Sequence, residues 1–194
     1  MLNSNIVLEN DQILLRVITE QDFSFLQGLA NDPSLWIYFT QDLSVAPDFD
    51  KWVAPAMKME RFQFVVIEKS SNAIVGSTAF GNYSPADQRI EIGWTWLGKD
   101  HHGTGINRQM KFLMVRYCAE VLKLKRVELK TDVLNLPARN ALLKMGFVEE
   151  GILRSHTQMT HDRRRDTIYY SLLEGEFEAF LKKISTSLLP PKYF

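Results

Sequence analysis

The stretch that decides the fold is Gly98-Lys-Asp-His-His-Gly103-Thr-Gly105-Ile-Asn107, in which a predicted strand turns directly into a long predicted helix. Glycine at positions 103 and 105 lets the backbone take positive φ angles and approach a ligand closely. The first N–H groups of the following helix have no partner inside the helix and lie at its positive end. Such a turn suits a phosphate or pyrophosphate, although the same spacing also occurs in turns that only connect a strand to a helix.

Two common phosphate-binding motifs do not match this turn. The Rossmann motif G-x-G-x-x-G requires a third glycine where this chain has Arg108, and it belongs to an early β-α-β unit. Here three antiparallel-looking strands come before the turn. The Walker A loop requires Gly-Lys-Ser/Thr, which does not follow. The sequence therefore excludes both of these nucleotide-binding classes.

The segments on the two sides of the turn have different periodicities. Residues 88–97 alternate as a strand does. We expect Ile90, Ile92, Trp94 and Trp96 to share one face, and Glu91, Gly93, Thr95 and Leu97 the other. Residues 106–122 carry an apolar stripe at helical spacing, which predicts a long amphipathic helix. The stripe consists of Ile106, Met110, Leu113, Met114, Tyr117, Cys118, Val121 and Leu122.

Working outward, the sequence predicts the element order β-α-α-β-β-β-α-β-α-β-β-α. The predicted strands are 13–17, 62–67, 74–80, 88–97, 126–131, 147–156 and 164–172, the last two forming a hairpin around His161 and Asp162. Five helices are predicted. The first follows a capping box over Thr19–Asp22, the second lies within 34–61, the third begins at 106, the fourth is capped by Asn135, and the last lies near Phe177. This order predicts an α/β fold with a mixed, mostly antiparallel sheet of about seven strands and helices on both faces.

The composition restricts the class of protein. The 194 residues contain 23 Lys plus Arg and 23 Asp plus Glu, a balance that argues against a nucleic-acid clamp or a polybasic membrane binder. One cysteine and four histidines make a metal site unexpected. No stretch approaches the roughly 18 apolar residues that span a bilayer. We expect a single cytoplasmic domain over residues 1–194, with its core at about 10–180.

Further motifs, taken with the turn, resemble one family. A meander of strands, the G-x-G turn, the long helix, Asn135-x-x-Ala138 and Lys144-x-Gly146-Phe147 together resemble the GNAT N-acetyltransferase superfamily. Four segments resemble its RimJ/RimL-type branch of ribosomal-protein N-terminal acetyltransferases: Glu91-Ile-Gly-Trp, His102-Gly-Thr-Gly-Ile-Asn107, Arg126-Val-Glu-Leu and Arg164-Arg-Asp-Thr-Ile-Tyr169. One residue departs from the pattern, because Asp100 stands where the family usually has Gln or Arg.

The resemblance implies a V-shaped cleft for acetyl-CoA. Strand 88–97 would separate from strand 126–131, and the pantetheine arm would lie between them and pair with the backbone near Trp94–Leu97. The pyrophosphate would rest on the amides of residues 100–106. The cofactor-binding residues that it implies are Trp94, Trp96, Leu97, Asp100, His102, Gly103, Thr104, Gly105, Ile106, Asn135 and Arg139.

Glu91 is the expected general base, because it lies opposite Ile90 and Ile92 on the cleft strand. The alternative is a structural glutamate, paired to a neighbouring arginine or capping the surface of the sheet. The tyrosine that the family uses as general acid is replaced by Leu142, and the serine of the RimL-like branch by Ala138. Since a thiolate is a good leaving group, solvent can act as the acid. Tyr169 or Tyr170 is an alternative donor.

The sequence therefore predicts an acetyl-CoA-dependent N-acetyltransferase that acts on a primary amine such as a protein N-terminus. Trp36, Tyr38 and Trp52 fall where the family builds its substrate wall, with core packing as the alternative. A small-molecule amine acceptor, an aminoglycoside or a polyamine, is the nearest alternative function. A catalytically weak acyl-CoA-binding module is another. Since proteins of the family that it resembles often dimerise, a homodimer is possible. Neither nucleic acid nor a membrane is an expected partner.

Overall fold

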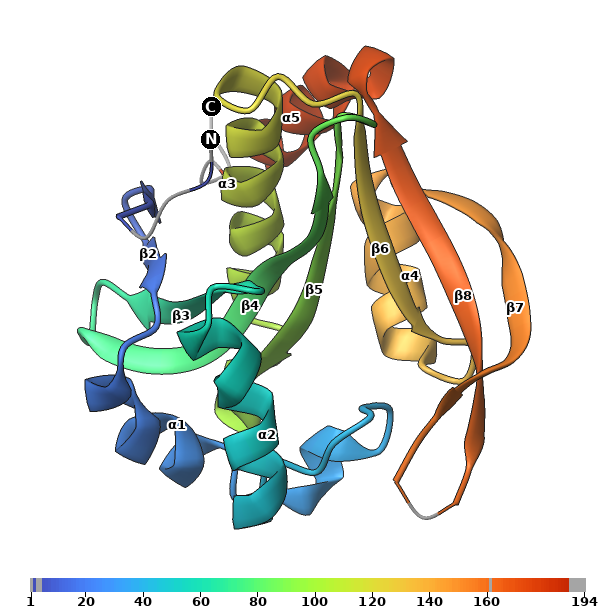
Figure 1. The fold of residues 1–194 in the computed structure, drawn as a ribbon. Helices are drawn as coiled ribbons and strands as arrows, with labels where there is room; N and C mark the ends of the chain where they lie inside the picture. Colours follow the sequence, from blue (N-terminus) through green and yellow to red (C-terminus); the bar gives the residue numbers. More distant parts are fainter. Residues whose placement is uncertain (1, 3–4, 161, 189–194) are drawn as a thin grey trace.

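The computed structural model describes residues 2, 5–160 and 162–188, which form one eight-stranded sheet with helices on both faces (Figure 1). The sheet order is β1-β2-β3-β4-β5-β6-β8-β7. The strands are β1 (Val7–Glu9), β2 (Ile13–Val17), β3 (Phe62–Glu68), β4 (Ala73–Ser84), β5 (Arg89–Leu97), β6 (Arg126–Asp132), β7 (Val148–Gln158) and β8 (Arg164–Leu173). The helices are α1 (Phe23–Leu29), α2 (Ala46–Met57), α3 (Ile106–Glu120), α4 (Leu136–Met145) and α5 (Glu174–Leu188), with 3₁₀ turns η1 (Glu20–Asp22), η2 (Pro33–Trp36) and η3 (Lys99–His101).

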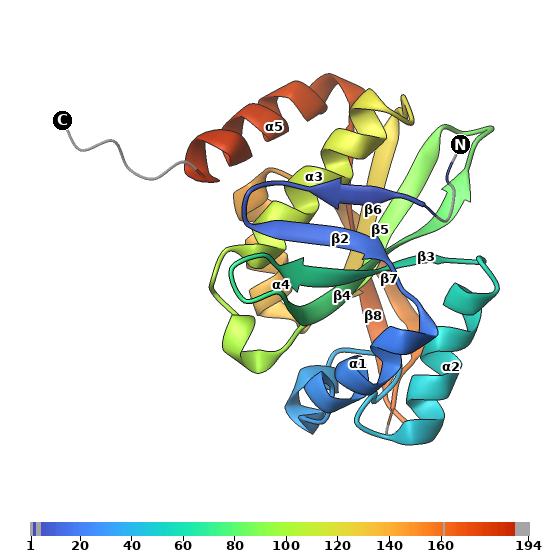
Figure 2. The ribbon, with the colours of Figure 1, turned by 90° about the vertical axis from the view of Figure 1, so that its left-hand side faces the viewer.

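Two apolar cores flank the sheet. The larger core lies between the sheet and α3, α4 and α5, and buries Met110, Leu113 and Met114 from the stripe of α3. The smaller core lies under α1 and α2 on the other face and is rich in aromatic side chains, including Trp36 and Trp96. Figure 2 shows α3, α4 and α5 on one side of the strands, with α1 and α2 apart from them. None of the described helices is long and apolar enough to cross a membrane.

The predicted order of elements is confirmed, with three differences. The sheet gains β1, a three-residue edge strand that is too short to show an alternating pattern. The last helix, α5, is longer than expected, because the sequence places its apolar residues only over the middle turns. The capping box at Thr19 is present, with Asp22 in the place usual for Glu, and it opens η1 before α1. The predicted turn residue His161 lies outside the described residues.

A β-bulge in β5 overturns the predicted alternation of faces. Ser77 pairs with Trp96 and Ala79 with Gly93, so β5 has one more residue than β4 over this interval. Trp94 lies at this bulge and has an unusual positive φ of 49°. Ile90 and Ile92 therefore pack in the core with α3, whereas Trp96 packs in the core under α1 and α2 with Trp94 against it. The four residues do not share a face, because the extra residue reverses the alternation after Gly93.

The separation of β5 from β6 is confirmed. These strands run parallel and pair only from Arg89 with Arg126 to Glu91 with Glu128. Beyond that row β5 continues to Leu97 and β6 to Asp132 without pairing to each other. Figure 1 shows the two strands close together at one end and far apart at the other. The gap leaves backbone of both strands without a sheet partner on this side.

Candidate active site

A cleft of about 760 Å³ opens where β5 and β6 separate, on the face of the sheet that carries α3 and α4. Its walls come from the end of β5, the turn that follows, the start of α3, one side of α4, the far half of α5, and η2 with the turn after it. The lining residues include Thr95, Trp96, Leu97, His101, His102, Gly103, Gly105, Asn107, Arg108, Ala138, Ala141, Lys144 and Lys183.

The turn before α3 has the geometry that its glycines predict. Gly103 and Gly105 have φ angles of 76° and 92°, and a Cβ added at either position would meet no heavy atom within 4 Å. Glycine is therefore favoured at these two positions because of the positive φ angles, and not because a side chain would clash with a neighbouring atom. His102 Nε2 lies 3.1 Å from the Leu97 carbonyl oxygen, which fastens the turn to the end of β5. Thr104 Oγ1 donates to the His101 carbonyl oxygen at 2.8 Å inside the turn.

The polar groups of this cleft fit coenzyme A. The lining contains Arg108, Lys144 and Lys183 and, among the described residues, no Asp or Glu. The free amides at the start of α3 and these cations suit phosphate groups. The Asn107 side-chain oxygen is buried with no hydrogen-bond donor from the described residues. A buried acceptor without a partner is rare, and this one belongs to a residue that lines the cleft.

The predicted cofactor-binding residues divide into two groups. Trp96, Leu97, His102, Gly103 and Gly105 line the cleft. The remaining six are placed around it, namely Trp94, Asp100, Thr104, Ile106, Asn135 and Arg139, and their side chains are not part of the lining.

The structure gives physical reasons for several of these placements. The Asn135 side chain accepts from the Ala138 N–H at 3.2 Å and caps α4. The Arg139 guanidinium donates to the Val133 carbonyl oxygen at 2.8 Å and to Tyr170 Oη at 3.3 Å, so it points to β8 and away from the cleft. Ile106 is buried in the core.

Several lining residues were not anticipated from the sequence. Pro137, Ala141, Lys144 and Met145 stand on one side of α4 at spacings of four, three and one residues, a helical pattern that could have identified them. Lys183 comes from α5. Nothing in the sequence near Lys183 links it to a turn 80 residues earlier, because only the packing of α5 brings it there.

Glu91 lies on the opposite face of β5 from Ile90 and Ile92, and it is 4% exposed. Its Oε2 accepts from Lys130 Nζ at 2.8 Å and from Asn82 Nδ2 at 2.6 Å. Its Oε1 lies over Gly93, 3.0 Å from the position that a Cβ would take there. The cation paired with Glu91 is thus Lys130 on β6 and not an arginine, and Oε1 takes no part in these two hydrogen bonds.

Further charged side chains lie on the Glu91 side of the cleft, on β6, on β8 and just before β8. Lys130 Nζ lies 5.9 Å from the centre of the Tyr169 ring on β8. Asp132 is fully buried and accepts from the Arg163 guanidinium. Burial lowers the pKa of Arg165, against the opposing effect of Asp132, Tyr169 and Glu91 nearby.

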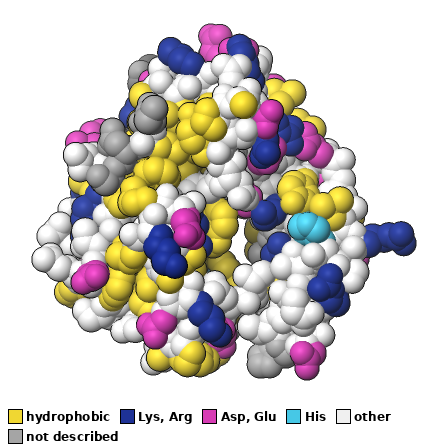
Figure 3. Space-filling view, in the orientation of Figure 1, with side chains coloured by type: hydrophobic (Ala, Val, Ile, Leu, Met, Phe, Trp, Pro, Cys, Tyr) yellow, Lys and Arg dark blue, Asp and Glu magenta, His cyan; other side chains and the backbone are white. Residues whose placement is uncertain are grey.

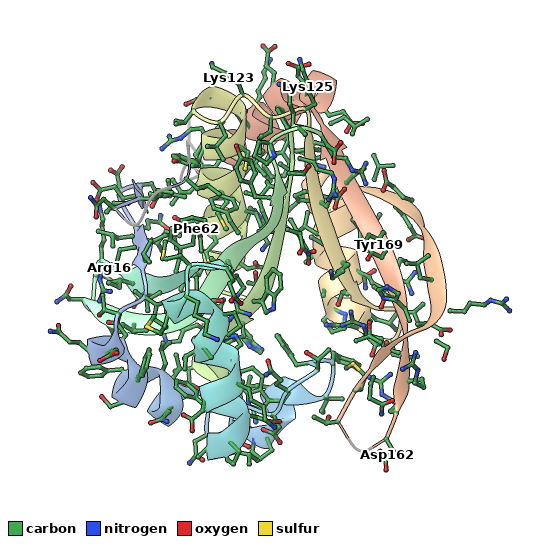
Figure 4. All side chains as sticks on the ribbon, in the orientation of Figure 1. Arg16, Phe62, Lys123, Lys125, Asp162 and Tyr169 are labelled. Carbon is green, nitrogen blue, oxygen red and sulfur yellow. The ribbon has the colours of Figure 1, made fainter. Side chains whose placement is uncertain are left out.

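Figure 3 shows the surface hollowed between the part with α2 and β5 and the part with β6, β7 and β8. Figure 4 marks Tyr169 on β8 and Asp162 at the tip of the β7–β8 hairpin.

Trp94 at the bulge is held between a glycine and a cation. A Cβ on Gly81 would come within 2.4 Å of the Trp94 ring, so the ring needs glycine beside it. The Arg61 guanidinium carbon lies 5.0 Å from the Trp94 ring centre and 5.7 Å from that of Trp52. Arg61 is 6% exposed, and burial lowers its pKa to about 10. Cation–π contacts of this kind are strongest when the cation is desolvated.

The three residues expected in the substrate wall occupy different environments. Trp36 is 2% exposed, donates from Nε1 to the Ala30 carbonyl oxygen at 2.9 Å and packs edge-on against Trp96. Trp52 is 3% exposed and also packs against Trp96. Both tryptophans form the core under α1 and α2. Tyr38 is half-buried in the turn after η2.

Comparisons with known proteins agree with this geometry. The chain is 27% identical over 176 residues to the "Putative ribosomal N-acetyltransferase YdaF" of Bacillus subtilis, covering 87% of this chain and 95% of that protein. Its fold matches the crystal structure of a GCN5-related N-acetyltransferase from Brucella melitensis with a TM-score of 0.90, at 24% identity, over 99% of this chain and 89% of that chain. It also matches a spermidine N-acetyltransferase from Vibrio cholerae in complex with CoA and spermine, with a TM-score of 0.73 at 20% identity, over 87% of this chain and 99% of that chain.

The family itself follows from a direct match. Residues 12–148 match the family model described as acetyltransferase (GNAT) domain. This range contains β2, the strands that open the cleft, the G-x-G turn, α3 and α4. The chain belongs to the GNAT acetyltransferase family, and it is an N-acetyltransferase that uses acetyl-CoA.

Proposed function

We propose that the acceptor is the N-terminal amine of a protein or peptide, and that Glu91 is the general base that takes its proton. Acetyl-CoA supplies an acetyl group activated as a thioester. The Oε1 atom of Glu91 stays outside its hydrogen bonds to Lys130 and Asn82, so it is available to the ammonium of the acceptor or to a bridging water. The bulge at Trp94 takes backbone out of the ladder beside the cleft, and an N–H there can donate to the carbonyl oxygen as it becomes negative.

The charge balance beside Glu91 is the observation that carries the choice of acceptor. Glu91 and Asp132 are already paired with Lys130 and Arg163. Glu128, the β6 residue in register with Glu91, is paired with Arg126 and Arg89. Arg165 adds a further cation. A polyamine or an aminoglycoside carries several positive charges and needs unpaired carboxylates to hold them. A peptide N-terminus presents one ammonium followed by neutral amides, which this balance accommodates.

An acceptor panel tests the proposal. A peptide with a free N-terminus and an internal lysine should be acetylated at its α-amine, as located by mass spectrometry, and the same peptide with a blocked N-terminus should be inert. Faster turnover of spermidine or of an aminoglycoside than of any free peptide would overturn the acceptor assignment. Released CoA can be followed by its thiol with little background, because Cys118 is buried and burial raises the pKa of its thiol.

The similarity to a putative ribosomal N-acetyltransferase of Bacillus subtilis favours a ribosomal protein as the first acceptor to include in the panel. The similarity in fold to the spermidine N-acetyltransferase of Vibrio cholerae makes spermidine the most informative small-molecule competitor. We place the reaction in the cytoplasm as part of the same proposal, and cell fractionation followed by immunodetection tests that location.

A further inference from the structure

Lys111, in the second turn of α3, is a buried lysine that the chemistry described above does not use. It is 3% exposed. Its Nζ donates to Thr95 Oγ1 at 2.8 Å. It forms no ion pair with any residue that the structure describes. A lysine is seldom fully buried without a partner of opposite charge, so its presence beneath the cleft requires a reason.

Thr95 connects this lysine to the cleft. It lines the cleft and directly follows the bulge residue Trp94. Its hydroxyl donates back across the bulge to the Gly93 carbonyl oxygen at 3.3 Å. It also lies 2.8 Å from the hydroxyl of Thr78, the β4 residue that faces the bulge. Because an ammonium can only donate, Lys111 occupies a lone pair of Thr95 Oγ1 and leaves its hydrogen for these partners.

The surroundings of Lys111 provide no negative charge. Burial lowers the pKa of Lys111 to about 7, and no charged neighbour opposes that effect. The titratable side chains of the cleft rim, His101, His102 and Arg108, are all basic. On the elements that pack against α3 or line the cleft, the charged side chains include Glu9 on β1, Arg16 on β2, Glu91 on the other face of β5, Lys144 on α4, and Glu178 and Lys183 on α5. None of these is paired with Lys111.

We propose that Lys111 is a positioning residue for acetyl transfer that acts through Thr95 and takes up a proton when the anionic cofactor enters the cleft. As an ammonium it fixes the Thr95 hydroxyl and with it the backbone of the bulge. It also adds one positive charge to the β5 wall, where negative charge develops on the acyl oxygen as the amine attacks. Such a charge is effective because Lys111 is buried away from water. The proposal rests on the cofactor cleft and not on the identity of the acceptor.

Proton uptake on cofactor binding is the first test, and it needs no turnover. Binding of CoA is measured by calorimetry at pH 7 in two buffers of different ionisation enthalpy, for the wild type and for Lys111→Met. Since a group with a pKa of about 7 is half protonated at that pH, the wild type should take up roughly half a proton more than the variant. Lys123→Met, at an exposed site near the end of α3 that Figure 4 marks, is the matched control and should behave as the wild type. Equal uptake by wild type and Lys111→Met would overturn the coupling.

Kinetics separate positioning from a merely structural role. Lys111→Met keeps the apolar stem, and replacing a lone buried charge with an apolar side chain is often tolerated or stabilising. Thr95→Val keeps the shape and removes the hydroxyl. Each variant should lower kcat with the acceptor KM unchanged. For Lys111→Met the fall should approach about 10²-fold, the size found when an interaction with the developing charge is lost. Lys111→Met should also lose the fall in kcat that the wild type shows as pH rises and Lys111 deprotonates. A folded Lys111→Met enzyme with the kcat and pH profile of the wild type would refute the proposal, and Thr95→Val gives an independent reading.

Discussion

The ammonium of Lys130 lies 2.8 Å from Oε2 of Glu91, across the point at which β5 and β6 cease to pair. The ion pair joins the two strands of the V where their backbone hydrogen bonds end. It also occupies the Oε2 atom of Glu91, while the Oε1 atom lies over Gly93. This contact therefore has a structural part, which holds the cleft, and a chemical part, which orients the proposed base.

Glu91→Gln separates these two parts. Glutamine keeps the size of the side chain and an oxygen for Lys130, but it cannot take a proton. We expect the rate of acetyl transfer to fall by roughly 10²–10⁴-fold. The Kd of acetyl-CoA should change little, because Glu91 is not among the residues that line the cofactor cleft. A Gln variant with full activity would show that the amine loses its proton in solvent. Lys130→Met is the comparison variant, since it keeps the carboxylate and removes the ion pair.

Gly105→Asp should greatly weaken the binding of acetyl-CoA. The φ of 92° at this position strains any residue with a Cβ, and an aspartate would add negative charge to a phosphate-binding turn. Gly105→Ala adds the strain without the charge and should have a smaller effect on Kd. Calorimetric titration with CoA measures both. Gly28→Asp carries the same charge at an exposed position of α1 and should bind as the wild type does. Unchanged affinity in folded Gly105→Asp would remove the turn from the cofactor site.

Gly81→Ala should disturb the bulge. The added Cβ would come within 2.4 Å of the Trp94 ring, which is closed in on another side by Arg61. Overpacking of this kind costs about 1–3 kcal/mol of unfolding free energy, measured by urea denaturation. The rate of acetyl transfer should fall as well, because Trp94 sets the backbone beside the cleft. Gly28→Ala meets no heavy atom within 4 Å and should stabilise α1 by up to about 1 kcal/mol. Equal stability of the two variants would contradict the tight seat of Trp94.

Stability should fall at low pH through Asp22. Burial raises the pKa of this carboxyl, but hydrogen bonds from Arg16 and Thr19 outweigh it and place the pKa below its usual value. A lowered pKa in the folded state gives stability that is complete above the unfolded pKa of about 3.9 and is lost as pH falls through the folded pKa. Asp22→Asn should therefore cost about 2 kcal/mol at pH 7 and show a smaller loss below pH 4. Asp50→Asn, at an exposed site, should follow the wild-type curve when unfolding is measured against pH.

The order of the elements and the phosphate-binding turn could be predicted from the sequence because both depend on local chemistry. The stripe of α3 repeats at the helical period, and Asn135 caps α4 through a hydrogen bond to Ala138, three residues away. Glycine permits the positive φ angles found at positions 103 and 105. The early separation of β5 and β6 was expected from the family resemblance, and the backbone pairing confirms it.

Only the tertiary structure decided which residues meet inside the site. Glu91 finds Lys130 from a strand 39 residues away, and Lys111 finds Thr95 through the docking of α3 on the sheet. The bulge at Trp94 reverses the side-chain faces, and no alternation in the sequence marks an inserted residue, because Trp is apolar on either face. Lys183 lines the cleft because α5 packs beside α4. Periodicity encodes the backbone of each element, whereas these contacts depend on register and packing between elements that are distant in the chain.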